Sequence, residues 1–249
     1  MPAFADNYIW CLRSGTAAAV VDPGDADPVL EYLDAQGLRL AAILCTHLHG
    51  DHVGGNAELL RRFPVPVYGP RSESIATVNR PLGEGNRVDL PEFSLTLQVL
   101  EVPGHTAGHI AYLGDGMLFC GDTLFAAGCG RLLGGTAEQM SRSLARLAAL
   151  PPDTRVYCAH EYTLANIRFA RKANPGNAAL RGREAVAQET RARGEPTLPS
   201  TIALERATNP FLRCNDAEVI ASAERHAGRR LGDGVSVFAA LRDWKNGFR

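Results

Sequence analysis

A chain of 249 residues, 45% hydrophobic and 21% charged, can bury a sizeable core, which excludes disordered and fibrous proteins. The formal net charge of -1 excludes a general affinity for nucleic acids or anionic membranes, so we expect neither as a partner. No apolar run approaches the roughly 20 residues that a membrane helix needs, and the N-terminus lacks the basic and apolar regions of a signal peptide.

The first elements predicted along the chain alternate between strand and helix. Residues 17–22 form an apolar strand that ends at a Pro-Gly turn signal, and a helix opens at Asp27 and stops at Gly37. A second buried strand covers residues 41–46. After a histidine-rich loop, residues 54–63 are predicted to be helical.

The next elements continue this α/β pattern. Residues 94–102 are predicted to be a strand, and residues 109–113 and 117–121 a hairpin around Gly-Asp-Gly. Apolar residues spaced by three and four predict a helix over 137–150, and residues 155–160 form a strand that ends on a histidine.

The character of the chain changes after His160. Helical periodicity broken by prolines predominates to the end, with little strand signal. We therefore expect two domains, with an α/β part over residues 1–162 and a helical part over 163–249.

The strongest local signal is the segment Thr-His-Leu-His-Gly-Asp-His at residues 46–52, directly after a buried strand. So many ligand-type side chains beside a packed core need a charge or a metal to satisfy them. We expect the glycines at 50, 54 and 55 to supply the backbone freedom of the turn. A merely His-rich surface loop is the alternative, but other histidines lie in the same kind of place.

Three further ligand-type residues each follow a predicted strand: His105, Asp122 and His160. Side chains that begin loops at one edge of a sheet come together, so a single site is expected. Two histidines lie outside this set. We interpret His226 as a solvated residue on a polar helix, and His109 as either an orienting partner of a ligand or a satisfied core residue.

Five imidazoles and two carboxylates are too many for one tetrahedral ion. The residues are predicted to hold two divalent ions, with Asp122 as the bridging carboxylate: His47, His49, Asp51, His52, His105, Asp122 and His160. Zinc is the first expectation, and iron and manganese also suit these donors. Ions about 3.5–4 Å apart can share a water and lower its pKa, which is the chemistry of hydrolysis.

The HxHxDH motif, a later His, an Asp and a last His resemble the metallo-β-lactamase superfamily. The resemblance implies a four-layer αβ/βα sandwich with metals at one edge, followed here by a helical domain. It also implies the distribution of ligands. His47, His49 and His105 would hold one metal, Asp51, His52 and His160 the other, and Asp122 would bridge them.

Further segments resemble the glyoxalase II family of hydroxyacylglutathione hydrolases. These are Asp-Asn-Tyr at 6–8, GDTLFAAGCGRLLGGT at 121–136, AHEYT at 159–163 and LRDWKNGF at 241–248. The resemblance implies that four side chains hold the glutathione part of a substrate: Arg131, Tyr162, Arg242 and Lys245. Arg or Lys donors suit the two carboxylates of glutathione. Leu133 departs from the Tyr found in many relatives, so one hydrogen bond to the substrate is expected to be missing.

The resemblance implies hydrolysis of S-D-lactoylglutathione and other S-2-hydroxyacylglutathiones to the hydroxy acid and glutathione, the second step of methylglyoxal detoxification. Hydroxide bridging the two ions attacks the carbonyl, and Asp51 and Asp122 are the catalytic carboxylates. Thiolate is a good leaving group, so no strong general acid is needed.

The sequence favours four other interpretations less. A glutathione persulfide dioxygenase with one iron shares the fold, but the complete second ligand set favours hydrolysis. A β-lactamase is expected to have different residues around the second metal, and a nuclease to have a basic arm. A structural metal module is typically closed and rich in cysteine ligands.

The six cysteines are interpreted as free thiols. Cys45, Cys120 and Cys158 lie in apolar segments, and no CxxC pair occurs. Buried free thiols are typical of a reducing cytoplasm, so we expect the protein to act there. We also expect it to be a monomer.

Overall fold

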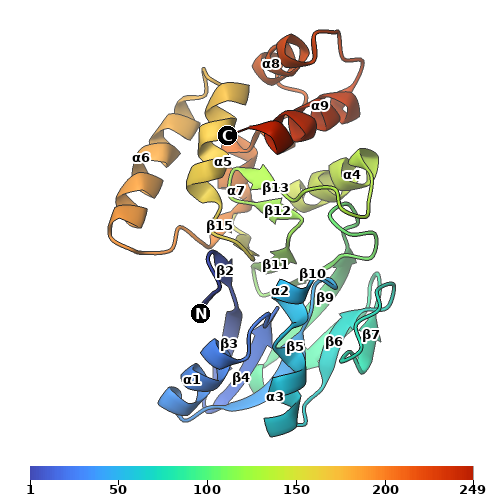
Figure 1. The fold of residues 1–249 in the computed structure, drawn as a ribbon, viewed down its shortest axis with the longest axis vertical. Coiled ribbons are helices and arrows are strands. Elements are labelled where there is room, and N and C mark those ends of the chain that lie inside the picture. The colour runs from blue at the N-terminus through green and yellow to red at the C-terminus, as the bar shows by residue number, and fades with distance from the viewer. Residues whose placement is uncertain (249) are drawn as a thin grey trace.

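Two β-sheets lie face to face between helices in the computed structural model, which describes residues 1–248 (Figure 1). The first sheet has five strands in the spatial order β3 (Trp10–Ser14), β4 (Ala17–Val21), β5 (Arg39–Leu44), β6 (Val67–Pro70) and β7 (Arg80–Leu82). Its first pair is antiparallel and the remaining pairs are parallel. All five side chains of β4 are buried, because both faces of this sheet are covered.

The second sheet has six strands. In spatial order they are β15 (Ser200–Thr201), β14 (Arg155–Cys158), β11 (Met117–Gly121), β10 (Ile110–Gly114), β9 (Leu95–Glu101) and β8 (Arg87–Leu90). The pair β11–β14 is parallel and the others are antiparallel. The outermost strand, β15, comes from the otherwise helical last third of the chain.

Three apolar clusters define the layers. Side chains such as Val21 and Leu44 of the first sheet pack against Val99 and Tyr112 of the second. The outer face of the first sheet packs against α1 (Asp27–Gln36) and α3 (Asn56–Arg62). The outer face of the second sheet packs against α4 (Ala137–Ala148) and later helices. The predicted four-layer αβ/βα arrangement is therefore confirmed.

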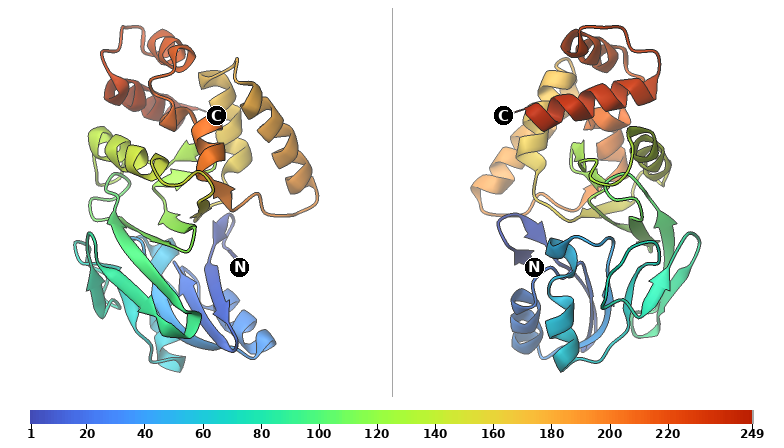
Figure 2. Two further views of the ribbon diagram at one scale, coloured as in Figure 1. Left: turned by 180° about the vertical axis from the view of Figure 1, so that it is seen from behind. Right: turned by 45° about the vertical axis from the view of Figure 1, so that its right-hand side comes forward.

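Helices form the half of the molecule opposite α1 and α3, as both views in Figure 2 show. They are α5 (Thr163–Ala173), α6 (Ala178–Ala192), α7 (Ile202–Thr208), α8 (Ala217–Ala227) and α9 (Gly234–Gly247), with a short 3-10 turn η2 (Pro210–Leu212). A helical C-terminal part was predicted from residue 163 onwards. The last residue of that prediction, Arg249, lies outside the described residues.

Small elements surround the junction of the two halves. The chain begins with a two-stranded hairpin of β1 (Pro2–Ala3) and β2 (Asn7–Tyr8). A second small hairpin, β12 (Leu124–Phe125) and β13 (Gly128–Cys129), follows β11. Neither hairpin was predicted, because strands of two residues carry no periodic signal.

The histidine-rich segment was predicted to be a loop, but part of it is helical. A short helix α2 (Gly50–Val53) includes Asp51 and His52, and α3 starts separately at Asn56 instead of continuing from residue 54. The predicted strand 155–160 also ends earlier, at Cys158, so that His160 lies beyond it.

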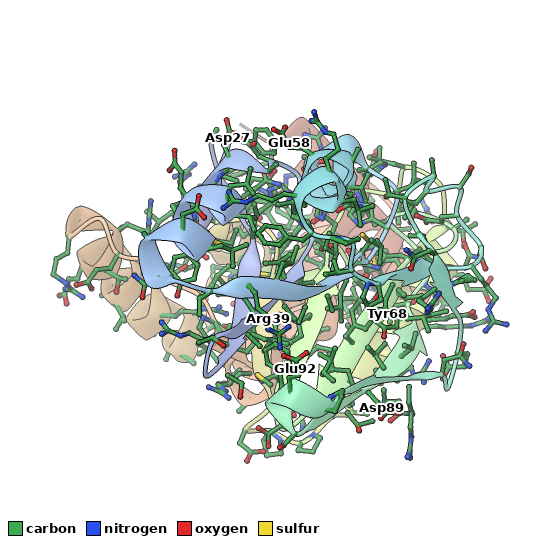
Figure 3. The ribbon with its side chains drawn as sticks, turned by 90° about the horizontal axis from the view of Figure 1, so that it is seen from below. Asp27, Arg39, Glu58, Tyr68, Asp89 and Glu92 are labelled. Carbon is green, nitrogen blue, oxygen red and sulfur yellow. The ribbon has the colours of Figure 1, made fainter. Side chains whose placement is uncertain are left out.

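An exposed ion pair joins the two sheets at the end of the sandwich remote from the helical half. Figure 3 shows Arg39 of β5 beside Glu92 of the 3-10 turn η1 (Pro91–Phe93), where the two form an ion pair between the sheets. Such exposed pairs contribute little stability. None of the helices within residues 1–248 is both long and apolar enough to cross a membrane.

Candidate active site

The histidine motif lies where the chain leaves β5 and turns into α2. The turn packs tightly against the Pro-Gly turn after β4, since a Cβ on Gly24 would lie 1.9 Å from the carbonyl oxygen of Asp51. The glycines at 50, 54 and 55 do not have positive φ angles, so the expected backbone freedom is not their role. A Cβ on Gly54 would lie 2.6 Å from a backbone oxygen, so close packing explains that glycine.

The other three candidate ligands follow strands of the second sheet. His105 follows β9, Asp122 follows β11 and His160 follows β14. Gly121 ends β11 with φ +47°, and a Cβ there would lie 2.3 Å from Thr46 Oγ1. This left-handed residue turns the chain directly before Asp122, and glycine adopts it without steric cost.

Three imidazoles form a first group. Both His47 Nε2 and His105 Nε2 lie 3.0 Å from His49 Nδ1. The candidate ligand atoms of these three residues all lie within 4.8 Å of one another, so they can reach a common ion.

Asp51, His52 and His160 form a second group. Asp51 Oδ2 lies 3.4 Å from His52 Nε2 and 3.5 Å from His160 Nε2. Their candidate ligand atoms also lie within 4.8 Å of one another. The side chain of Asp51 is 43% exposed, whereas that of His52 is 1% exposed.

Asp122 lies between the two groups. Its Oδ2 is 3.4 Å from His105 Nε2 of the first group. Its Oδ1 is 3.5 Å from His52 Nε2 and 3.3 Å from His160 Nε2 of the second. One oxygen of the carboxylate thus faces each group. All seven predicted ligands come together at one end of the sandwich.

The donor atoms fit divalent cations. His52 Nε2 and Asp122 Oδ1 are buried and have no hydrogen-bond partner among the described residues, although buried polar atoms normally have one. Burial and neighbouring imidazoles lower the pKa of His47, which keeps it in the neutral form that binds metal. Burial alone would raise the pKa of Asp122, but His52 and His160 outweigh it and lower that pKa below its usual range. A carboxylate together with imidazoles is a typical donor set for divalent transition metals.

A buried carboxylate that the sequence analysis did not identify supports the motif. Asp22, at the end of β4, accepts hydrogen bonds from Thr46 N at 2.7 Å and Thr46 Oγ1 at 2.8 Å. Its Oδ2 also lies 3.1 Å from His52 Nδ1. The available signal was an acidic residue that ends an apolar strand, the same pattern that identified Asp122.

Two residues of the N-terminal hairpin belong to the family-like segment at 6–8, but the sequence analysis assigned them no role at the site. Asp6 Oδ1 lies 2.8 Å from His160 Nδ1, and Asn7 Nδ2 donates to Asp51 Oδ2 at 3.0 Å. They stand about 40 to 150 positions from their partners, so no local pattern could have paired them.

The remaining histidines differ in environment. His109 is fully buried, its ring stacks on His47 at 4.6 Å, and its Nε2 accepts the Asp122 N–H at 3.1 Å. Burial lowers the pKa of His109 to about 3, so its imidazole is neutral. His226 is exposed, as expected, and its ring stacks on Trp244.

A cavity of about 490 Å³ connects the metal-ligand candidates with the helical half. At one end it is lined by His49, Asp51, His105, Asp122 and His160. At the other it is lined by the four residues that the family resemblance singled out: Arg131, Tyr162, Arg242 and Lys245. We call these two ends the ligand end and the cationic end. Leu133 also lines the cavity and is 62% exposed.

Arg242 of α9 is the most buried cation at the cationic end, at 5% exposed. Its Nη1 donates to the carbonyl oxygen of Cys129 at 2.8 Å, and its Nε donates to Asn246 Oδ1 at 3.2 Å. No carboxylate of residues 1–248 forms an ion pair with it. A buried cation paired only with neutral groups is suited to an anionic ligand.

Lys245 lies one helical turn after Arg242. Its Nζ donates to the Ala165 carbonyl oxygen at 3.3 Å and lies over the rings of Phe169 and Phe248. Burial, followed by the charges of Arg242, Arg168 and Arg131, lowers the pKa of Lys245 to about 8. A negatively charged group in the cavity would therefore stabilise the protonated form of Lys245.

Arg131 and Tyr162 connect the two ends. The backbone oxygen of Arg131 lies 2.8 Å from His105 Nδ1, while its side chain is exposed. The ring of Tyr162 stacks on that of His160, with centroids 4.7 Å apart and planes 2° apart. Burial raises the pKa of the Tyr162 hydroxyl, which therefore stays a neutral hydrogen-bond donor.

Known proteins resemble both halves of this chain. The profile of the Metallo-beta-lactamase superfamily matches residues 5–160, and that of the Hydroxyacylglutathione hydrolase C-terminus matches residues 161–248. A hydroxyacylglutathione hydrolase of Nitrosomonas europaea is 58% identical over 247 residues, which are 99% of this chain and 94% of that protein. The chain belongs to the hydroxyacylglutathione hydrolase family. The fold and the seven-residue cluster together indicate that this family member binds divalent metal ions.

Solved structures agree on the fold. ETHE1 from Myxococcus xanthus is 26% identical, covers 96% of this chain and 92% of its own, and has a TM-score of 0.64. TTHA1623, solved in a di-iron-bound form, is 30% identical, covers 83% of this chain and 95% of its own, and has a TM-score of 0.59. The hydrolase family's C-terminal profile also spans Tyr162, Arg242 and Lys245, so the relationship includes the cationic end.

Proposed function

We propose that the chain hydrolyses S-D-lactoylglutathione and other S-2-hydroxyacylglutathiones, with the thioester at the ligand end of the cavity and the glutathione part at the cationic end. Family membership makes it a thioester hydrolase. The position of Asp122 is the observation that supports placing the thioester at the ligand end. Asp122 lies between the two ligand groups, and the cavity that it lines also contains cations without carboxylate partners at its other end.

Two divalent cations would be held by the two groups. We assign His47, His49 and His105 to the first cation and Asp51, His52 and His160 to the second. Asp122, whose Oδ2 faces the first group of residues and whose Oδ1 faces the second, would be shared by the two cations. Zinc is our first choice of metal, and the di-iron form of TTHA1623 supports iron as an alternative. Manganese suits the same donors.

Such a pair of cations supplies a water of lowered pKa and a Lewis acid for the carbonyl oxygen. The protein's own groups then orient the reaction. Asp51, half exposed to the cavity, accepts a hydrogen bond from the attacking water and directs it at the carbonyl carbon. The C–S bond breaks, and the thiolate of glutathione leaves without a strong general acid because a thiol pKa is about 8.5. The products are D-lactate and glutathione, as in the second step of methylglyoxal detoxification.

The cationic end would fix the glutathione part. Arg131, Arg242 and Lys245 supply donors for its two carboxylates, and charge-assisted bonds of this kind are about twice as strong as neutral ones. The Tyr162 hydroxyl adds a neutral donor beside His160. Leu133 supplies no donor at the place where it lines the cavity.

A kinetic comparison of several S-acylglutathiones, with metal content measured on the same sample, tests this proposal. We expect turnover of S-D-lactoylglutathione with two metal ions per chain, and a much higher KM for thioesters that lack the glutathione carboxylates. A persulfide dioxygenase with one iron would instead consume oxygen with glutathione persulfide and leave the thioester intact.

The organisation of the protein completes the proposal. We infer a catalytic domain over 1–162 and a helical substrate-binding domain over 163–249, and a monomer that acts in the cytoplasm. The free state of all six cysteines supports a reducing compartment.

A further inference from the structure

The two ligand groups share the support of Asp22, through Thr46 and His52, but differ in their remaining outer contacts. In the first group, His47 Nδ1 contacts Thr46 Oγ1 at 3.0 Å, and His105 Nδ1 contacts the Arg131 carbonyl oxygen at 2.8 Å. Thr46 is fully buried between the sheets and the Arg131 backbone is part of the cavity wall. These contacts come from the core of the sandwich and its adjoining loops.

Two of the three members of the second group, His160 and Asp51, contact the N-terminal hairpin, whereas His52 Nδ1 lies 3.1 Å from Asp22 in the core. His160 Nε2 faces Asp122, while its Nδ1 lies 2.8 Å from Asp6 Oδ1. A histidine that binds a metal through one nitrogen is oriented by a carboxylate that accepts a hydrogen bond from the N–H of the other nitrogen, and the carboxylate also increases its basicity. Asp6 stands in that position relative to His160.

Asn7 acts on the second carboxylate of the same group. Asp51 is the most exposed acidic candidate ligand, at 43% compared with 11% for Asp122. Asn7 is 7% exposed, and its Nδ2 donates to Asp51 Oδ2 at 3.0 Å and to the Asp51 carbonyl oxygen at 3.3 Å. The amide of Asn7 therefore fixes the direction of a carboxylate that solvent alone would leave free.

The hairpin is itself fixed to the loop that carries His160. Tyr8 N donates to the Ala159 carbonyl oxygen at 2.7 Å, and Glu161 N donates to the Asp6 carbonyl oxygen at 2.8 Å. The Tyr8 hydroxyl donates to Glu161 Oε2 at 3.0 Å. The consecutive residues Asp6, Asn7 and Tyr8 thus contact His160, Asp51 and the backbone beside His160, respectively. These contacts fix the hairpin to the second group.

We propose that Asp6 and Asn7 are positioning residues for the second ligand group alone, so that binding of the second cation depends on the N-terminal hairpin and binding of the first does not. This inference rests on the proposed two-cation site. Loss of such an outer contact typically weakens metal binding by about 10–100-fold. The effect is expected at one site of the pair only.

The test is a titration of metal-free full-length protein with Zn²⁺ by calorimetry, with metal content measured after dialysis. We expect wild type to bind two ions, and Asp6→Ala to bind the first with unchanged affinity and the second about 10–100-fold more weakly. Asp6→Asn keeps an acceptor oxygen and should recover part of the loss. Asn7→Ala should weaken the same site through Asp51.

Asp153→Ala is the matched control, because Asp153 is exposed and precedes β14, at the end of that strand remote from His160. It should bind both ions as wild type does. The thermal midpoint of each variant in excess chelator separates a lost metal contact from a lost fold. If Asp6→Ala does not fold, Asp6→Asn and Asn7→Ala decide the question at the second site.

Wild-type affinity at the second site in the Asp6 and Asn7 variants, or an equal loss at both sites, would overturn the inference while leaving hydrolysis untouched. A wild-type chain that binds a single ion would overturn the two-cation proposal, and this inference with it. Thioester turnover measured on the same samples distinguishes these outcomes from a wrong substrate.

Discussion

The two ends of the cavity are built in different ways. At the ligand end, side chains from four strand ends converge with donor atoms 3.0–3.5 Å apart, and most of them are buried. At the cationic end, Lys245 has a single backbone acceptor and the Arg131 side chain is exposed. The side chains of the ligand end are therefore fixed before a substrate binds, whereas Lys245 and Arg131 at the cationic end have few fixed partners in the protein. Changes at the ligand end should be severe, and changes at the cationic end graded.

The largest effect is expected at Asp122, which faces both ligand groups. Asp122→Ala removes the shared carboxylate and leaves five imidazoles with one acid, Asp51. We expect loss of at least one bound ion. Removing a single oxyanion donor lowers kcat by about 10²–10³-fold, and we expect a larger decrease here. Metal analysis and a thioester assay on one sample measure both. Asp89→Ala, at the remote end of the sandwich (Figure 3), is the control. Full activity in the Asp122 variant would contradict the proposed mechanism.

The ligand end could be predicted from sequence because its pattern is local. Four ligand-type side chains of the motif fall between residues 47 and 52, and the other three each follow an apolar strand. β9, β11 and β14 run in the same direction in the second sheet, so the residues that follow them lie at one edge, beside the end of β5 in the first sheet. The partners Asp6, Asn7 and Asp22 were missed because their contacts are set by packing between distant segments.

The cationic end could be identified only by resemblance. Arg242 and Lys245 stand three apart on a helix, a spacing that many solvated helices share. Their distinction is tertiary, since Arg242 is buried without a carboxylate partner among residues 1–248. The small strands β6 to β8 were also missed, because β6 and β7 contain prolines and β8 alternates over only four residues.

Arg242 should give the second largest effect. Arg242→Met removes a buried donor group that is proposed to bind a carboxylate of glutathione. A hydrogen bond to a charged group contributes about 1.5–3 kcal/mol, so KM should rise about 10- to 100-fold with a smaller change in kcat. Arg61→Met is the matched control, since Arg61 is an exposed cation on α3, in the other half of the molecule and outside the cavity. A wild-type KM in Arg242→Met would place the glutathione part elsewhere.

Lys245 should make binding depend on pH. Its pKa is lowered to about 8, so the free enzyme loses this cation as the pH rises through about 8, and KM for the thioester should increase there. Lys245→Arg remains charged and should flatten this part of the KM profile. An unchanged profile in Lys245→Arg would assign the pH dependence to another group.

The same shift has a consequence for stability. In the unfolded chain Lys245 regains its usual pKa near 10.4, so between pH 8 and 10 the unfolded state binds more protons than the folded state. The contribution of this residue to the free energy of unfolding should therefore rise with pH in that range. Urea midpoints of wild type and Lys245→Arg, compared at both ends of the range, measure it. A falling difference would contradict the sign.

The smallest effect is expected at Leu133, where the cationic end lacks a donor. Leu133 is 62% exposed and lines the cavity, so an aromatic side chain can replace it without repacking the core. Leu133→Tyr adds a hydroxyl that can bind the peptide part of the substrate. One neutral hydrogen bond contributes about 0.5–1.5 kcal/mol, so KM should fall about 2- to 10-fold. Leu133→Phe supplies the ring without the hydroxyl. If both variants lower KM equally, ring packing and not a hydrogen bond is the cause, and if neither does, the peptide does not pass this residue.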